Sequence, residues 1–335
     1  MEEKKGIKSL MQIRGMGAAV TAFIGLFVIY AAFAIMNPMV LSSQNILNLL
    51  RSMSKYLLIG IGQSYVMITA NIDLSIGSVV GMSAMVTATL MTLGVSPILA
   101  MMVSLACGMM IGVMNGILVG KYKLPPFIAT LGTMFVARGV AYMVNGNRNT
   151  DSISSTLNKA TADHFQNFFY YGKTLGIYNT FLIALVIFIV FFVLLSKTRT
   201  GRHIYAIGSN VDAARLSGVN VVTTTMKAYL VSAFCSTVVG FFLCAQAGMG
   251  NMDAGNTYEM YAVAAGVIGG VSPMGGSGLL LGTFAGASVW QVLENGLNMI
   301  GAQVGIQRIV IGIIVVLAVL ADSVLRGGGL KKKNK

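Results

Sequence analysis

Charged residues are scarce in this sequence. They make up 10% of the 335 residues, whereas 56% are hydrophobic. A soluble globular domain carries roughly a quarter charged residues, so this composition excludes a soluble protein and indicates a polytopic membrane protein. The formal net charge of +13 is compatible with a nucleic-acid partner, but the basic residues lie between apolar runs, as expected of membrane loops. We therefore expect contact with membrane lipid and no nucleic acid.

Cysteine and histidine are also rare. Cys107, Cys235 and Cys244 each lie in an apolar run and lack the spacing of a disulfide framework or a zinc site. We expect them to be packing residues. The two histidines, His164 and His203, lie in different loops and have no plausible metal partners. No metal site is therefore expected.

No catalytic motif is evident. Gly172-Lys173-Thr174 resembles the end of a phosphate-binding loop, but Asn167 stands where the first glycine of that motif would be. We therefore expect no catalytic residues, no cofactor held by this chain, and no enzyme activity of its own.

Ten apolar segments predict the fold class. It is an all-α integral membrane protein of about ten transmembrane helices, with broken central segments and both termini cytoplasmic. The longer segments approach the roughly 20 residues that a helix needs to cross the hydrocarbon core. Residues 1–335 are taken as one polytopic membrane domain. The predicted spans are residues 17–36, 56–70, 76–93, 97–120, 127–144, 180–196, 228–248, 260–271, 279–295 and 308–320.

The distribution of basic residues predicts the orientation. Of the 23 Lys and Arg residues, sixteen fall on the side assigned as cytoplasmic, six fall outside, and Arg138 lies within a span. This bias follows the positive-inside rule, although Arg51 and Lys55 lie on the unfavoured side. Residues 145–179 are predicted to form an extracytoplasmic loop and residues 197–227 a cytoplasmic loop.

A short helix is predicted within the basic cytoplasmic loop. Asn210 or Ser209 can cap its N-terminus, and Asp212 in its first turn suits the helix dipole. Asp212 and Arg215 are three residues apart and can pair, while Gly218 can close the helix in a left-handed conformation. A helix this short is marginal alone in water. A solvated loop helix and a helix presented to a partner both fit the pattern.

Glycine recurs every four residues in two apolar segments. Each set forms a smooth stripe on one helix face, which favours close helix contact within the bundle or at a dimer seam over a role in the substrate path. The two sets are Gly108, Gly112, Gly116 and Gly120, and Gly278, Gly282 and Gly286.

Polar residues interrupt two central apolar segments. Asp73 lies between two apolar runs, where an ionisable group is by default a functional-site hypothesis. The competing interpretation is structural, because Asp73 or Asn71 can cap the helix that follows. Residues 251–274 form the second broken segment and include Asp253 and Glu259. Paired broken segments often mark the central site of a transporter.

A third group of polar residues lies near the end of the ninth predicted span. It comprises Gln291, Glu294, Asn295 and Asn298. The side chains at 291, 294 and 298 share one helix face.

Several of these segments resemble a known family. Residues 201–210 (Gly-Arg-His-Ile-Tyr-Ala-Ile-Gly-Ser-Asn) and 213–219 (Ala-Ala-Arg-Leu-Ser-Gly-Val) resemble the coupling loop of permease subunits of ribose-type ABC sugar importers. Residues 71–78 (Asn-Ile-Asp-Leu-Ser-Ile-Gly-Ser) look like a signature of the same family. Residues 126–134, 258–260, 264–270 and 293–297 are also similar to it. At Tyr261 the chain departs from the family, in which Asp often stands there.

The resemblance implies a permease subunit of a binding-protein-dependent ABC importer in the cell (inner) membrane. Its cargo would be a simple sugar, a ribose-like pentose or a hexose, with nucleosides or a sugar-like signal molecule as alternatives. Implied partners are an ABC ATPase subunit, which would hold ATP and Mg, an extracytoplasmic solute-binding protein, and a second permease copy or a sister permease. Rival classes are an ion-coupled secondary transporter, with Asp73 as the ion site, and a membrane scaffold.

Two sets of site residues follow from the motifs and the resemblance. ATPase coupling is expected of Gly201, Arg202, Ala206, Gly208, Asn210, Asp212, Ala213, Ala214, Arg215 and Gly218. The translocation path is expected to include Asn71, Asp73, Ser75, Thr130, Thr133, Glu259, Glu294 and Asn295.

Overall fold

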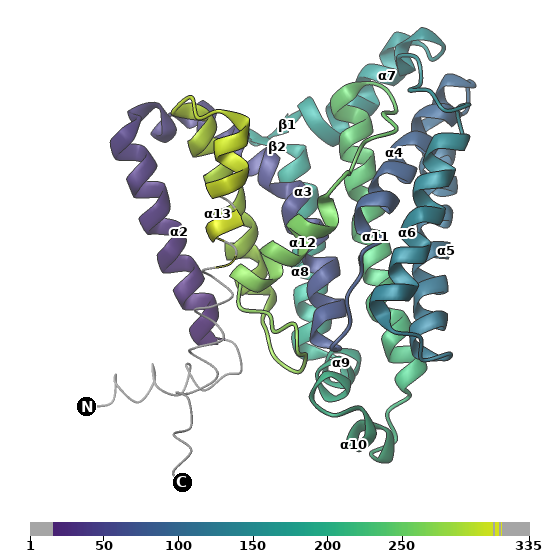
Figure 1. The fold of residues 1–335 in the computed structure, drawn as a ribbon. Coiled ribbons are helices and arrows are strands. Elements are labelled where there is room, and N and C mark those ends of the chain that lie inside the picture. Colours follow the sequence, from purple (N-terminus) through teal and green to yellow (C-terminus); the bar gives the residue numbers. More distant parts are fainter. Residues whose placement is uncertain (1–15, 311, 315, 317–335) are drawn as a thin grey trace.

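A computed structural model describes residues 16–310, 312–314 and 316, which form a bundle of long helices (Figure 1). The predicted all-α class is confirmed, because the only strands in these residues are two of two residues each. Residues 1–15, the basic C-terminal tail and residues 311, 315 and 317–320 of the predicted span 308–320 lie outside the described residues. The elements are α2 (Met16–Met36), η1 (Pro38–Leu41), α3 (Ser43–Ile68), α4 (Ile76–Thr92), α5 (Pro97–Gly120), α6 (Pro126–Met143), η2 (Ile153–Ser155), α7 (Lys159–Gln166), η3 (Asn167–Tyr171), β1 (Lys173–Thr174), β2 (Ile177–Tyr178), α8 (Asn179–Lys197), α9 (Arg199–Ser209), α10 (Val211–Leu216), α11 (Val221–Ala247), α12 (Tyr258–Ile268) and α13 (Leu280–Met299).

Several helices have the length and composition of membrane spans. In the described part of the chain these are α2, α5, α6, α8 and α11. Helices α4 and α12, and a further helix at Val304–Ile314, are apolar but shorter. The multi-pass architecture is therefore confirmed, while the number of spans stays a prediction.

The two longest polar segments lie at opposite ends of the bundle. Helix α7 and the β1–β2 hairpin belong to residues 145–179, and helices α9 and α10 belong to residues 197–227 (Figure 1). We call these the outer end and the inner end, following the charge bias, and this assignment of sides stays a prediction.

Helix α3 is longer than predicted. It runs unbroken over Ser43–Ile68, so the helix begins 13 residues before the expected start of the second span at residue 56, and the span boundary itself stays a prediction. Two basic residues suggested a boundary there, but both lie inside the helix. The guanidinium of Arg51 lies over the rings of Tyr170 and Tyr178, 4.6 and 4.1 Å from their centroids. Such cation–π contacts stabilise a charge without ending the helix.

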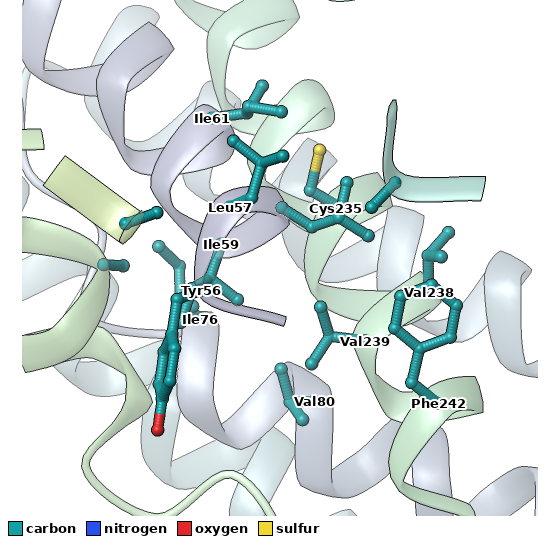
Figure 2. Close-up of a cluster of buried hydrophobic side chains, with 14 of the residues drawn as sticks. Tyr56, Leu57, Ile59, Ile61, Ile76, Val80, Cys235, Val238, Val239 and Phe242 are labelled. Atoms are coloured by element: carbon teal, nitrogen blue, oxygen red, sulfur yellow. The ribbon is translucent and has the colours of Figure 1, made fainter. Parts of the chain in front are cut away.

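The core lies where α3, α4 and α11 meet. Helix α11 contacts both of the others and also α5. Cys235 and Cys244 are buried in this core, as expected of packing residues. Figure 2 shows Tyr56, Leu57, Ile59 and Ile61 from α3 beside Ile76 and Val80 from α4 and Cys235, Val238, Val239 and Phe242 from α11.

The first glycine stripe is a helix contact within the chain. A Cβ atom added at Gly112 would lie 2.8 Å from the Ala233 Cβ, and one at Gly116 would lie 2.7 Å from the Met226 Cα, so α5 packs closely on α11. The second stripe brings α13 against α12, but Gly278 lies before α13, with a φ of +139°. Gly278 therefore belongs to the turn before α13 and is not part of the glycine stripe on that helix.

Gly112→Leu is expected to lower the melting temperature and folded yield of the protein in detergent. Overfilling a tightly packed contact typically costs about 1–3 kcal/mol. The matched control is Gly25→Leu on α2, where nothing lies within 4 Å of an added Cβ. Equal melting temperatures for the two variants would contradict close packing of α5 on α11.

Two helices begin inside the bundle, which matches the predicted broken segments. Helix α4 starts at Ile76 after a non-helical stretch that rises from the inner end of α3 (Figure 1). Helix α12 starts at Tyr258 after a coil that descends from the outer end of α11 (Figure 1). The first break buries the side chains of Asp73 and Ser75, whereas the second leaves Asn251, Asp253 and Asn256 exposed.

Candidate functional site

Asp73 lies in the break between α3 and α4 and is only 2% exposed. Its Oδ1 atom accepts hydrogen bonds from the backbone N–H and the hydroxyl of Ser75, at 2.9 and 2.6 Å. Its Oδ2 atom accepts one from the Ser232 hydroxyl of α11 at 2.7 Å. No cation in the described part of the chain forms an ion pair with it. Three donors therefore satisfy a buried carboxylate that would otherwise be unpaired.

Polar side chains continue from Asp73 across the bundle. Asn115 of α5 donates to the Ser75 hydroxyl at 3.0 Å, and the Thr133 hydroxyl of α6 donates to Asn115 Oδ1 at 2.6 Å. The Thr133 hydroxyl also lies 3.1 Å from the Thr130 carbonyl. Four of the predicted path residues are thus joined in one buried network.

Asn115 and Ser232 were missed by the sequence analysis. Each is an uncharged polar residue within a long, largely apolar helix, and both are fully buried. Polar side chains of this kind hydrogen-bond between helices in membranes. Their position in apolar spans was the only available signal, and it did not name their partners.

The predicted capping role of Asn71 or Asp73 was wrong in detail. Ser75 occupies the N-cap of α4 and makes no side-chain capping bond. Asp73 accepts hydrogen bonds from this N-cap residue itself, just ahead of the helix. The Asn71 amide donates to Thr69 at the end of α3. The two side chains therefore fix the break between the helices and leave the first turn of α4 uncapped by them.

The two broken segments touch at the start of α4. A Cβ atom on Gly77 would collide with the Glu259 carboxylate and the Gly255 carbonyl, so glycine permits this approach. Arg138 of α6 donates to the Ala254 carbonyl at 2.9 Å, which ties the coil ahead of α12 to α6. Glu259 therefore lies at the junction of the two breaks.

Glu294 and Asn295 lie apart from the Asp73 network, on α13. Glu294 accepts a hydrogen bond from the Tyr56 hydroxyl at 2.7 Å, and Asn295 exchanges hydrogen bonds with Asn45 at 3.0 and 3.1 Å. The eight predicted path residues therefore form separate groups and not one cluster.

The short helix predicted in the 197–227 loop is α10. Asn210 Oδ1 accepts from the Ala213 N–H at 2.9 Å, which identifies the N-cap. Arg215 pairs with Asp212 at 3.3 Å, and Gly218 has a φ of +81°. The local pattern therefore predicted this helix and both of its ends.

Helix α9 was not predicted, because its sequence contains no apolar run. It buries Ile204 and Ile207 on one face. Gly208 packs so closely on the Ile68 carbonyl that a Cβ atom would collide with it, and the Gly276 N–H donates to that same carbonyl at 2.9 Å. Helix α9 is thereby fixed to the inner end of α3 and to the loop between α12 and α13.

A second contact joins α9 to the same loop. The Tyr205 hydroxyl donates to the Gly278 carbonyl at 2.6 Å. Burial raises the pKa of Tyr205 to about 12, so the hydroxyl keeps its proton at neutral pH and remains a donor. Movement of α9 would therefore be transmitted to both α3 and the α12–α13 loop.

The residues predicted for coupling differ in exposure. Ala214 is 4% exposed and faces the protein, and its expected part in ATPase coupling stays a prediction. Leu216, which was not predicted, is 90% exposed at the end of α10. The exposed predicted residues are Arg202, Asn210, Asp212, Ala213, Arg215 and Gly218, the half-buried ones are Ala206 and Gly208, and Gly201 is buried with Ala214.

Two cavities meet at the inner side of the α3–α4 break. One of about 500 Å³ is lined by Asn71, Gly208, Asp212 and Arg215 among others, and so reaches α10. The other, of about 290 Å³, is lined by Asn71, Pro273 and neighbours. Asn71 borders both cavities. Among the described residues no group of three His, Cys, Asp or Glu is placed to hold a metal ion.

The sequence of the chain is similar to those of known membrane permeases. Residues 45–319 match the family described as branched-chain amino acid transport system, permease component. The chain belongs to this permease family. The permease is accordingly a multi-pass protein of the inner membrane. No solved structure matches it significantly.

Curated relatives cover nearly the whole permease. It is 37% identical over 300 residues to the ribose import permease of Bacillus subtilis, a match covering 90% of this chain and 91% of the relative. It is 33% identical over 305 residues to the D-allose transport system permease of Escherichia coli, covering 90% and 91%. It is 33% identical over 313 residues to the galactose/methyl galactoside import permease of Escherichia coli, covering 90% and 93%.

Proposed function

We propose that the chain is the permease subunit of an ATP-driven importer for a simple sugar. The names of three relatives support this cargo, since they import ribose, allose or galactose. A ribose-like pentose or a hexose is favoured over nucleosides or a sugar-like signal molecule. In this proposal a separate ATPase holds ATP and Mg, an extracytoplasmic binding protein delivers the sugar, and a second permease subunit completes the path.

The observation that carries the proposal is the connection between α10 and the broken helices. Helix α10 exposes Leu216 at the inner end, and α9 next to it is anchored to the end of α3 and to the α12–α13 loop. The break that begins α4 follows the end of α3 directly, and the C-terminal end of α12 leads into the α12–α13 loop. A partner that moves α10 on ATP binding would therefore act on the helices that border the centre of the bundle.

Reconstitution tests this proposal. The permease is placed in liposomes with its cognate ATPase and binding protein, and uptake of radiolabelled ribose, allose and galactose is measured with ATP inside or outside. Uptake of at least one sugar that requires both ATP and the binding protein is the expected result. Uptake that follows an ion gradient and ignores ATP would instead support the secondary-transporter alternative, and nucleoside uptake alone would correct the cargo.

A further inference from the structure

Four aromatic rings gather where α3, α12 and α13 meet. The Tyr56 ring centroid lies 6.2 Å from that of Tyr258, 5.8 Å from that of Tyr261 and 6.3 Å from that of Trp290. The Tyr261 and Trp290 centroids are 4.8 Å apart. These are separations of interacting aromatic pairs. Tyr258 and Tyr261 are only half-buried, so part of each ring is open to a ligand.

The Tyr56 side chain contacts two groups of opposite charge. The Lys55 ammonium lies 4.8 Å from the Tyr56 ring centroid, and the Tyr56 hydroxyl donates to Glu294. Figure 2 shows this hydroxyl pointing away from the apolar core around the ring. No ion pair joins Lys55 to Glu294 in the described structure. Ionisable groups at such depth are costly and mark a functional site, and here each charge remains available to a ligand.

Buried amides without partners extend the polar character of this region. Gln291 Oε1, one helical turn before Glu294 on α13, is buried and has no hydrogen-bond partner in the described structure. Both amide atoms of Gln63, two turns beyond Tyr56 on α3, also lack one. An unsatisfied buried polar group typically costs about 1–3 kcal/mol, so these amides are a cost that an ordinary apolar core would avoid.

A polar approach leads to the rings from the outer end. Gln44, Asn48, Arg51 and Lys55 recur at helical spacing on one face of α3, and none is fully buried. From the other side, a cavity of about 440 Å³ lined by Asn251, Asp253, Asn256 and others reaches Tyr258. In a membrane protein, such a polar face is expected to border water or a ligand and not lipid.

We propose that Tyr258, Tyr261, Glu294 and Lys55 form a sugar-contacting subsite in the permease, with Tyr56 and Trp290 as its supporting rings. The apolar C–H face of a sugar ring stacks on the exposed tyrosine rings, while its hydroxyls bond to the carboxylate and the ammonium. This inference rests on the proposed import of a simple sugar and names the residues that would recognise it.

Trp290 is the only tryptophan of the chain, so the tryptophan fluorescence of the permease itself comes from this subsite alone. Full-length permease in lipid nanodiscs is titrated with D-ribose, D-allose and D-galactose, and with ribitol and galactitol, which carry hydroxyls but no ring. A saturable fluorescence change with at least one ring sugar, and none with the alditols, is expected. Tyr261→Leu should abolish the change, and Glu294→Gln should weaken apparent affinity about tenfold, because a hydrogen bond to a charged acceptor becomes one to a neutral acceptor. Tyr261→Phe, which keeps the ring, should respond.

Phe188→Leu is the matched control. The Phe188 ring centroid lies 5.5 Å from that of Phe284, in a contact between α8 and α13 outside the proposed subsite. This variant should therefore bind and transport sugar as the unmodified permease does. Melting temperatures identify any variant that fails to fold. Fluorescence that is silent to all three sugars while the complex transports one, or that responds equally to alditols, would overturn the subsite. A specific response without ATP-driven transport would support the subsite and refute the import role.

Discussion

Leu216→Lys is expected to reduce ATP-driven uptake about thirtyfold, because removing an interface anchor commonly costs about 2 kcal/mol of binding. Leu216 is 90% exposed at the end of α10, so this apolar side chain is hardly buried by the described residues. Lysine suits a helix C-terminus, so the substitution does not weaken α10 itself. The readouts are sugar uptake and co-purification of the ATPase, and both should be lost together.

Leu175→Lys provides the control for this experiment. Leu175 is 95% exposed in the β1–β2 turn at the outer end, so the same substitution is made at the same exposure on the opposite end of the bundle. That variant should retain the ATPase. Loss of ATPase binding in both variants would indicate a general effect of the added charge, and retention in both would refute α10 as the contact. Ala214 is unsuitable for such a test, because it is buried and its replacement would report on folding.

The apolar pattern predicted most helices, and local chemistry predicted the ends of α10. Charge patterns failed where tertiary contacts stabilise a charge inside a helix, as the rings of Tyr170 and Tyr178 do for Arg51. Helix α9 was not predicted because its two buried isoleucines, Ile204 and Ile207, are isolated among polar residues and form no apolar run. Gly208 allows α9 to pack closely against the Ile68 carbonyl. This contact joins residues far apart in the sequence, so the sequence alone did not predict it.

In the candidate site, the sequence likewise identified individual polar residues but not the distant residues that contact them. The sequence showed Asp73 between two apolar runs and Glu294 near the end of a predicted span, where carboxylates are rare. It did not show their partners. Ser232 is 159 residues from Asp73, and Tyr56 is 238 residues from Glu294, so only the packing of distant helices brings each pair together. The aromatic rings were likewise scattered over three segments that no local pattern connects.

A pair of substitutions at Asp73 should separate its structural role from an ion-coupled one. Asp73→Asn keeps one carbonyl oxygen for the Ser75 donors and removes the charge. The Ser232 hydroxyl can rotate to pair with the new amide. We therefore expect this variant to fold with a modestly lowered melting temperature and to retain most of its uptake.

Asp73→Ala removes the acceptor of three hydrogen bonds at a site that is 2% exposed. The Ser232 hydroxyl and the Ser75 N–H would remain buried without their partner, at a cost of about 1–3 kcal/mol for each group left unpaired. The loss would spread through Ser75 to Asn115 and Thr133, which hold α5 and α6 against the start of α4. Folded yield and melting temperature should therefore fall sharply, with uptake falling alongside them. If Asp73→Asn is inactive yet as stable as the unmodified permease, the carboxylate carries an ion or proton, and the structural account of the Asp73 network is wrong.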